Sequence, residues 1–435
     1  MIRSVHSACD QINTVVFLVP RPVSAFEEEK WCFSYLRSQG LSVKVIDLTK
    51  VLNRRSDLID SVINSVDQPI RGKFIYQVNS FQEFESLVKM FSGNSIFIDY
   101  LVGLSVISLR EERVFRILKI QKARYAIISS GALPLAPQFP IHSNSRLGIC
   151  WSKIVKFVSN PILIINFSIS KIIITLTRQR LIYPLPEIIF GGVSEVVCRF
   201  VEKRALITKV IPINSSDFDA TAELLRASGN KMPDEQNICV FLDEAVTHHS
   251  DFKMLNIEPA DPEKYYCEMN RFFDFVEKET GLEVVVAAHP RANYESSDPF
   301  SGRRLIKGKT AELVSKSKLV VAHMSTALSF AVLFKKPVVS VKIPGLKAGS
   351  YLNSMVETMA SAIGNIPVDL EQGVLTGSIL HMQPDEKKYA EYERRYVKTL
   401  GAEELTCWEI FAKTIKSKNV TEISQSENMV FDVND

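Results

Sequence analysis

Short apolar runs alternate with amphipathic stretches along most of the chain. Thr14–Pro20 is apolar after its first residue, as in a buried strand, and Leu41–Leu48 alternates like a second strand. Between them, Ser24–Gly40 begins with a Ser N-cap and early acidic residues and ends on glycine, which predicts a helix. Strands separated by helices in this rhythm predict a parallel, doubly wound α/β sheet.

The alternation of predicted strands and helices begins again at Asn237–Ala245, which is predicted to be a buried strand. Asp261 and Pro262 then open a predicted helix that Gly281 ends. One stripe of that helix is apolar and comprises Tyr265, Met269, Phe272, Phe273 and Val276. We therefore expect two Rossmann-like domains that face a cleft.

A chain of 435 residues is too long for one ordinary core, which also favours two domains. We predict an N-terminal Rossmann-like domain over residues 1–190 and a C-terminal one over residues 191–385. C-terminal helices are expected over 386–417, and the polar residues 418–435 are expected to form a disordered tail.

The composition is that of a folded globular protein, with 46% hydrophobic and 23% charged residues. The seven cysteines are scattered without a Cys-x-x-Cys pair, which argues against a zinc site or a disulfide scaffold and favours reduced, cytosolic thiols. No apolar core of signal-peptide length precedes Thr14.

One segment is strongly biased in charge, because no Asp or Glu occurs between Glu112 and Glu187. Its cations include Lys153, Lys156 and Lys171, and it contains the apolar run Asn160–Thr177, which polar residues interrupt before it is long enough to span a membrane. The apolar part is typical of a core element or an interfacial one. The unopposed cations favour contact with an anionic membrane leaflet or a phosphorylated lipid acceptor. A nucleic-acid role is disfavoured because no recognised binding module is present.

Polar, chemically active side chains follow three predicted strands of the second domain. Because ligands of open α/β sheets bind outside the carboxyl ends of the strands, we expect these loops to share one site. The candidates are Asp243, Glu244 and His248 in the first loop, His289, Pro290 and Arg291 in the second, and Ser325 and Thr326 in the third.

Each feature also has an ordinary structural interpretation. Ser325 and Thr326 precede a predicted helix whose free N–H groups suit a phosphate, but Ser and Thr also serve as plain N-caps. His248 and His289 are typical of exposed loop histidines as well. Asp217 and Asp219 form an Asp-x-Asp pattern, which we interpret as the N-cap of the following helix and not as a metal site.

Taken in order, Asp-Glu, His-Pro and Ser-Thr resemble the D/E-D/E-G, HP and S-S/T motifs of bacterial GT-B glycosyltransferases that use CMP-activated sugars. The longer pattern over residues 205–342 resembles capsule and O-antigen enzymes related to Kdo transferases. The resemblance implies that His289 and Pro290 contact the nucleotide, that Ser325 and Thr326 bind the CMP phosphate, and that Asp243 lies at the reacting sugar. Arg291 is a further candidate donor to the charge that develops on the departing phosphate. Ala245 departs from the motif, where the family has glycine.

The resemblance also implies a GT-B fold whose first domain binds a glycan or lipid-linked acceptor, a CMP-Kdo donor, and no required metal or cofactor. The product would belong to bacterial surface polysaccharide, made in the cytoplasm with peripheral contact to the inner face of the membrane. Asp243 would be the nucleophile of a retaining reaction or the general base of an inverting one, with His248 or His249 assisting as acid or base. The departure at Ala245 leaves open whether Asp243 or Glu244 faces the sugar, and we favour Asp243 because it directly ends the strand. A nucleotide-sugar epimerase of the same fold and a non-catalytic glycan-assembly partner are the alternatives.

Overall fold

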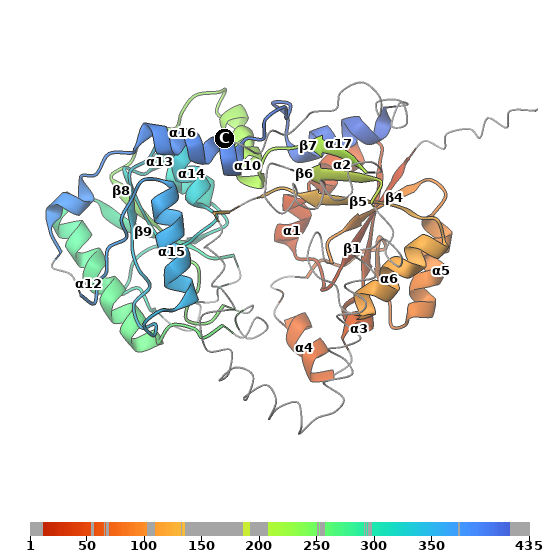
Figure 1. Cartoon of the computed structure of the whole chain (residues 1–435), viewed down its shortest axis with the longest axis horizontal. Coiled ribbons are helices and arrows are strands. Elements are labelled where there is room, and N and C mark those ends of the chain that lie inside the picture. Colours follow the sequence, from red (N-terminus) through yellow and green to blue (C-terminus); the bar gives the residue numbers. More distant parts are fainter. Residues whose placement is uncertain are drawn as a thin grey trace, which may run out of the picture.

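The computed structural model describes residues 12–134, 186–191 and 208–417, apart from 54–55, 65, 67–68, 102–108, 132, 250–251, 253–256, 291, 293, 295–297 and 373–374. Within this part of the chain, two α/β domains lie side by side, each built on a parallel sheet (Figure 1). The predicted fold class, two Rossmann-like doubly wound α/β domains, is confirmed.

The N-terminal sheet has seven parallel strands in the order β3-β2-β1-β4-β5-β6-β7. Alternate residues of β1 enter two separate apolar cores, with Phe17 on one face of the sheet and Leu18 on the other. This two-sided burial is why the strand reads as a continuous apolar run. The strands are β1 Thr14–Val19, β2 Ser42–Asp47, β3 Ile75–Gln77, β4 Ser95–Asp99, β5 Arg124–Ser129, β6 Ile188–Gly191 and β7 Lys209–Pro212.

The helices of this domain lie on both faces of the sheet. They are α1 Ala25–Lys30, α2 Phe33–Ser38, α3 Thr49–Leu52, α4 Ser56–Asn64, α5 Phe81–Phe91 and α6 Leu109–Ile120. The prediction of one helix over Ser24–Gly40 is wrong in one respect. Ser24 does cap α1 in a capping box with Glu27, but Cys32 has a left-handed backbone (φ 49°) that separates α1 from α2. The break lets Trp31 stack on Tyr100, with ring centroids 4.3 Å apart.

The C-terminal sheet has five parallel strands in the order β10-β9-β8-β11-β12. They are β8 Ile238–Leu242, β9 Glu283–Ala288, β10 Leu305–Lys307, β11 Leu319–Ala322 and β12 Val338–Ser340. Counted from the first strand, both sheets follow the Rossmann order 3-2-1-4-5. In such an order the connections reverse direction beside the first strand, here between β8 and β11, and ligands bind at the carboxyl ends of these strands.

The long helix predicted after Asp261 is confirmed as α12 Pro262–Thr280. Asp261 caps it, Gly281 ends it with a left-handed backbone (φ 68°), and the whole predicted apolar stripe is buried. The other helices of this domain are α10 Ser216–Ala227, α13 Thr310–Lys316, α14 Leu328–Leu333, α15 Tyr351–Ala362, α16 Glu386–Tyr392 and a π-helical turn at Glu393–Val397.

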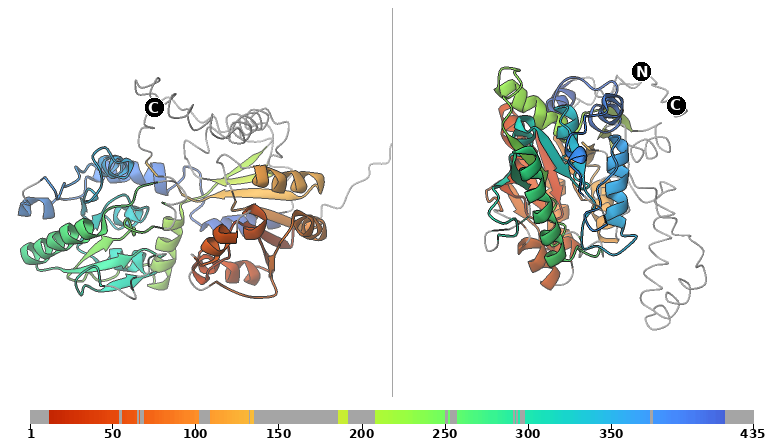
Figure 2. Two further views of the ribbon diagram at one scale, coloured as in Figure 1. Left: turned by 90° about the horizontal axis from the view of Figure 1, so that it is seen from below. Right: turned by 90° about the vertical axis from the view of Figure 1, so that its left-hand side faces the viewer.

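The predicted boundary between residues 190 and 191 is wrong, because β6 spans it and β7 pairs with β6 in the N-terminal sheet. The first domain therefore extends to Pro212, and the second begins with α10, at the junction of the domains (Figure 2). Short strands of four residues with polar neighbours carry too little periodicity to be assigned to a sheet from sequence.

The C-terminal helices are not a separate unit. Tyr389 and Tyr392 of α16 belong to the C-terminal core, whereas α17 (Cys407–Lys416) returns to the N-terminal domain. There Trp408 packs against Phe17, with ring centroids 5.6 Å apart, and donates a hydrogen bond to the carbonyl of Lys30 (3.2 Å). The end of the described chain thus completes the first core.

Asp217 and Asp219 both lie in the first turn of α10, but the N-cap is Ser215, so their predicted capping role is wrong. Asp219 accepts a hydrogen bond from the backbone N–H of Cys407 (2.9 Å) and so joins α10 to α17. Burial raises the pKa of Asp219 to about 7. Within the described part of the chain, no three His, Cys, Asp or Glu side chains gather in a group that suits a metal ion.

The segment predicted to contact a membrane, with Lys153, Lys156, Lys171 and the run Asn160–Thr177, lies outside the described residues, as does the predicted tail. Among the helices that the structure describes, none combines the length and the apolar character needed to cross a membrane.

Candidate active site

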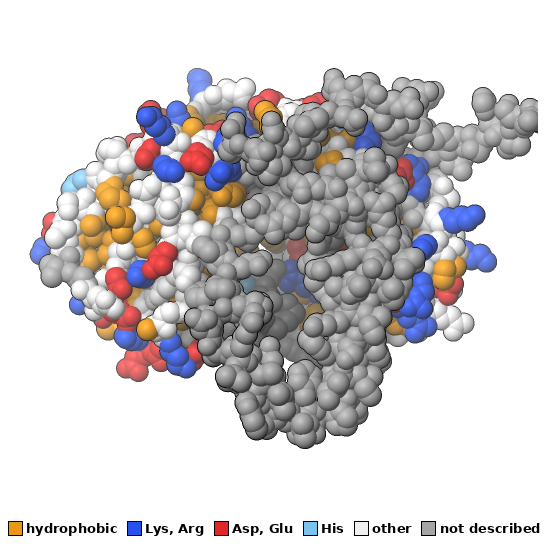
Figure 3. Space-filling model, in the orientation of Figure 1, with side chains coloured by type: hydrophobic (Ala, Val, Ile, Leu, Met, Phe, Trp, Pro, Cys, Tyr) orange, Lys and Arg blue, Asp and Glu red, His pale blue; other side chains and the backbone are white. Residues whose placement is uncertain are grey.

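The three predicted loops meet at the carboxyl edge of the C-terminal sheet. The central strand β8 pairs with β9 on one side and β11 on the other, so the residues that follow these three strands are neighbours. In the space-filling view, basic and acidic side chains are both spread over the described surface of the two domains (Figure 3). The expected convergence of the three motifs at one edge of the sheet is therefore present.

The Asp243 carboxylate joins the first loop to the second. Its Oδ2 accepts hydrogen bonds from the backbone N–H of His289 (3.0 Å) and from the hydroxyl of Tyr294 (2.9 Å). Its Oδ1 accepts a hydrogen bond from the backbone N–H of Ala245 (2.9 Å). The side chain is only 5% exposed. Three donors and little contact with solvent give Asp243 the features of a group that holds the loops in position.

The Glu244 carboxyl group joins the first loop to the third. Its Oε2 accepts a hydrogen bond from the backbone N–H of Met324, the residue before Ser325 (3.1 Å). Removal from water raises the pKa of Glu244 to about 8, the negative charge of Asp243 adds to this rise, and the Met324 hydrogen bond opposes it. A carboxyl group that changes charge near neutral pH is suited to acid–base chemistry.

Ala245 occupies the third position of the first motif, where the family has glycine. Its backbone is left-handed, with φ 49°, the conformation that a glycine at this position would adopt without strain. The bond from its N–H to Asp243 helps to hold this turn. The turn therefore has a left-handed conformation that glycine adopts readily, and the alanine holds it with some strain.

We expect Ala245→Gly to raise the free energy of unfolding, by up to about 1 kcal/mol, because relief of the left-handed strain outweighs the added freedom of the unfolded chain. The matched control is Ala260→Gly, a buried alanine without a positive φ, which should lower stability. Urea unfolding of both variants measures the difference. An equal loss of stability in the two variants would contradict the role of the left-handed turn.

Histidine and tyrosine rings line the same edge. His248 is exposed, its Nδ1 lies 2.8 Å from the Thr247 hydroxyl, and its ring meets Tyr294 edge-on at 5.5 Å. His249 and His289 also meet edge-on, with ring centroids 4.8 Å apart. These rings form a half-exposed aromatic wall beside Asp243.

His289 and Pro290 are both half-buried at the end of β9, whereas Arg291 lies outside the described residues. The predicted contacts of His289 and Pro290 with a nucleotide remain predictions. An aromatic wall of this kind offers flat faces on which a base can stack.

Ser325 and Thr326 follow β11, as predicted, but the helix begins later than expected. α14 starts at Leu328, and its N-cap Ala327 makes no side-chain cap. Ser325 is nearly buried and accepts a hydrogen bond from the Ala327 N–H (3.3 Å), while Thr326 is exposed. The role of both residues at a phosphate remains a prediction.

Sequence reasoning missed a buried histidine beneath the site. His323 Nδ1 lies 2.7 Å from the carbonyl of Val341, and its Nε2 lies 3.1 Å from the Tyr265 hydroxyl. Burial lowers the pKa of His323 to about 4, so the ring is neutral, donates to Val341 and accepts from Tyr265. Tyr294 was missed as well. The signal for both was their position, at or shortly after the end of a strand that carries a motif.

No protein-family model and no curated protein matches this sequence. Among solved structures, the chain is similar to the wall teichoic acid polymerase TagF, with TM-score 0.45 and 10% identity over 94% of this chain and 90% of that one. It is also similar to the UDP-GlcNAc 2-epimerase of Methanocaldococcus jannaschii (TM-score 0.40, 11% identity, 92% and 98% covered) and to MurG of Acinetobacter baumannii (TM-score 0.37, 7% identity, 93% and 94% covered). All three TM-scores are below 0.5, so the structural similarity is low.

Proposed function

We propose that this protein is a glycosyltransferase that takes its sugar from a CMP-activated donor. One observation carries the proposal: two hydrogen bonds, from His289 to Asp243 and from Met324 to Glu244, tie three loops around a pair of adjacent carboxyl groups. The edge they share lies where the strand connections of a Rossmann-like sheet reverse, the usual place of a nucleotide in such folds.

In this proposal the donor lies across the three loops. His289 and Pro290 contact the cytidine, and Ser325 and Thr326 contact its phosphate. When the bond between the sugar and the phosphate breaks, the phosphate oxygen keeps the electron pair and gains negative charge. Hydroxyl and backbone donors fixed at the end of β11 would stabilise that charge where it develops.

We assign the acid–base role to Glu244 and a positioning role to Asp243. As a nucleophile, Asp243 would have to leave three hydrogen bonds and reach the sugar from a buried position. Glu244 accepts one backbone hydrogen bond, is half-buried, and has a raised pKa. Its ionised form would take the proton of the acceptor hydroxyl as the acceptor oxygen bonds to the anomeric carbon and CMP departs, which predicts inversion.

For the sugar we propose Kdo or a related ulosonic acid, since the order Asp-Glu, His-Pro, Ser-Thr resembles that of enzymes related to Kdo transferases. The acceptor would be a glycan or a lipid-linked oligosaccharide of a bacterial surface polysaccharide. We further propose that the enzyme works at the inner face of the cytoplasmic membrane, because of its acid-free basic segment.

The test is CMP release from CMP-Kdo, measured with and without a lipid extract of bacterial envelopes. We expect release that depends on the extract and produces a Kdo-labelled glycolipid. In a parallel reaction, UDP-GlcNAc without acceptor tests the epimerase alternative, which predicts release of UDP and free sugar. No CMP release under either condition, or equal release without acceptor, would reject the transferase.

A further inference from the structure

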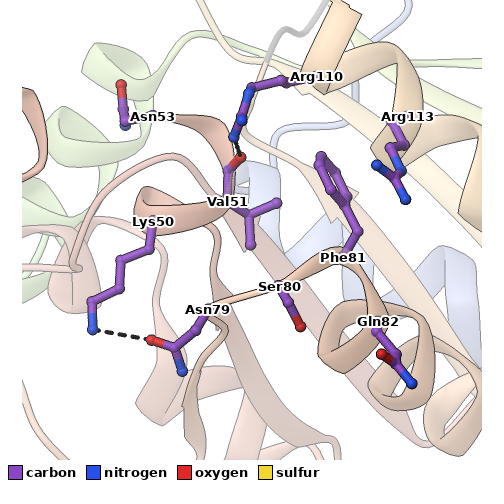
Figure 4. Close-up of a pocket in the computed structure, with 9 residues that line it drawn as sticks. All are labelled: Lys50, Val51, Asn53, Asn79, Ser80, Phe81, Gln82, Arg110 and Arg113. Carbon is purple, nitrogen blue, oxygen red and sulfur yellow. Dashed lines mark hydrogen bonds between the residues drawn. The ribbon is translucent and has the colours of Figure 1, made fainter. Parts of the chain in front are cut away.

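A pocket of about 470 Å³ lies in the N-terminal domain, remote in sequence from the donor loops (Figure 4). Its lining contains three cationic side chains, four other polar ones and no carboxylate. The lining residues are Lys50, Val51, Asn53, Asn79, Ser80, Phe81, Gln82, Arg110 and Arg113.

The pocket belongs to the carboxyl edge of the N-terminal sheet. Residues 50–53 follow β2, residues 79–82 follow β3, and α6, which supplies Arg110 and Arg113, is the helix after β4. This edge is directed toward the second domain, because the Ser130 carbonyl after β5 accepts a hydrogen bond from the Ser216 N–H at the start of α10 (2.8 Å). A ligand in the pocket thus lies at the edge that ordinarily binds ligands in such sheets.

Each of the three cations contacts at least one neutral group. Arg110 donates to the carbonyl of Val51, and Lys50 donates to the amide oxygen of Asn79 (3.1 Å). The guanidinium of Arg113 lies over the ring of Phe81, 4.3 Å from its centroid. Figure 4 shows these side chains arising from separate elements around Val51 and Phe81.

Two carboxylates close in sequence to the lining residues are engaged with other groups. Glu83, in the first turn of α5, already accepts hydrogen bonds from the backbone and side-chain N–H groups of Asn79 (2.8 and 3.3 Å). Asp47, at the end of β2, is buried and accepts from Thr49 (2.9 Å). Within the described ranges, no carboxylate forms an ion pair with Lys50 or Arg113. Among the described residues, Lys50 and Arg113 are therefore two cations of the pocket lining that form no ion pair, and neutral hydrogen-bond donors lie beside them.

We propose that this pocket binds the phosphate or pyrophosphate group of a phosphorylated ligand, and, resting on the proposed function, that this ligand is the sugar acceptor. Arginine and lysine combined with amide and hydroxyl donors are the set that recognises phosphate oxygens. The volume is in the range of small-molecule sites and exceeds what one phosphate fills, so the pocket also has room for the group that carries the phosphate.

The test is calorimetric titration of inorganic pyrophosphate, at low salt and with saturating CMP, into the full-length protein. The double variant Lys50→Gln with Arg113→Gln removes two exposed cations and should weaken pyrophosphate binding by about 10-fold or more. The matched control, Lys89→Gln with Lys119→Gln, removes two exposed cations from α5 and α6 outside the pocket and should bind as the wild type does. Equal affinity in the two double variants, or no pyrophosphate binding by the wild type, would overturn the proposal.

Two further measurements identify the source of the phosphate and separate this proposal from the proposed function. Sedimentation with vesicles that contain phosphatidic acid, reduced in the pocket variant relative to the control, indicates a lipid-borne phosphate. Pyrophosphate binding without vesicle binding indicates a water-soluble phosphorylated glycan, and either result supports the pocket. CMP affinity should be unchanged in the pocket variant. If CMP does not bind at all, the titration without CMP still tests the pocket, and only the donor assignment fails.

Discussion

Glu244→Gln is expected to slow sugar transfer about 10²- to 10⁴-fold while CMP affinity and folding stay close to those of the wild type. Glutamine keeps the shape of the side chain and an oxygen that can accept from the Met324 N–H, but it cannot take a proton from the acceptor. The measurement is kcat for CMP release with acceptor present. The matched control is Glu263→Gln, an exposed glutamate in the first turn of α12, which should have no effect.

The role of Glu244 as a general base also sets the direction in which the transfer rate changes with pH. The pKa of Glu244 is raised to about 8, and a general base acts in its ionised form. The rate, measured as kcat/KM, should therefore rise with pH up to about 8 and then level off. This rising limb should be absent from the residual activity of Glu244→Gln. A rate that falls through pH 8 would mean that Glu244 acts as an acid, and full activity in the glutamine variant would remove it from the mechanism.

Asp243→Ala is expected to lower the free energy of unfolding of the C-terminal domain by at least about 3 kcal/mol. The substitution leaves three donors without their charged acceptor, and a hydrogen bond to a charged group contributes about 1.5–3 kcal/mol. The affected donors are the N–H groups of Ala245 and His289 and the hydroxyl of Tyr294. Differential scanning calorimetry measures the loss.

Asp243→Asn gives the sharper comparison, because both oxygens of Asp243 accept hydrogen bonds. Asparagine must place its NH₂ group against one of these donors, so it should lose part of the stability that alanine loses. Asp234→Ala, at an exposed aspartate before β8, is the control and should be neutral. If Asp243→Ala kept the stability of the wild type but lost all transfer, Asp243 would be a reacting group and not a positioning one.

The convergence of the three motifs could be predicted from sequence because it depends on one rule about parallel sheets. Asp243, His289 and Ser325 each follow an apolar run, and runs of that kind become neighbouring parallel strands whose carboxyl ends share an edge. The cap, stripe and end of α12 were predictable for a similar reason, since Asp261 and Gly281 act locally.

What sequence did not reveal depends on contacts between distant residues. The return of α17 to the first core rests on Trp408 meeting Phe17, far away in the chain. The choice between the adjacent carboxylates Asp243 and Glu244 depends on which one faces the donors of the β9 loop. A sequence pattern contains no information on that orientation.

The phosphate pocket, too, could not be predicted from the sequence. Lys50, Asn79 and Arg113 belong to three separate connections, and each is unremarkable among its neighbours in sequence. Only the parallel order of β2, β3 and β4 brings these connections together. A site built from single residues of several loops therefore becomes visible only once the fold is known.

All the chemistry proposed here requires one cytidine nucleotide to bind where the three loops meet. Hydrogen–deuterium exchange of the full-length protein, with and without saturating CMP, tests this most directly. We predict slower exchange in three separate peptides, covering residues 242–249, 288–294 and 323–330, with little change across β1–β5. Protection confined to one of these peptides, protection elsewhere, or none at saturating CMP would contradict the shared nucleotide site.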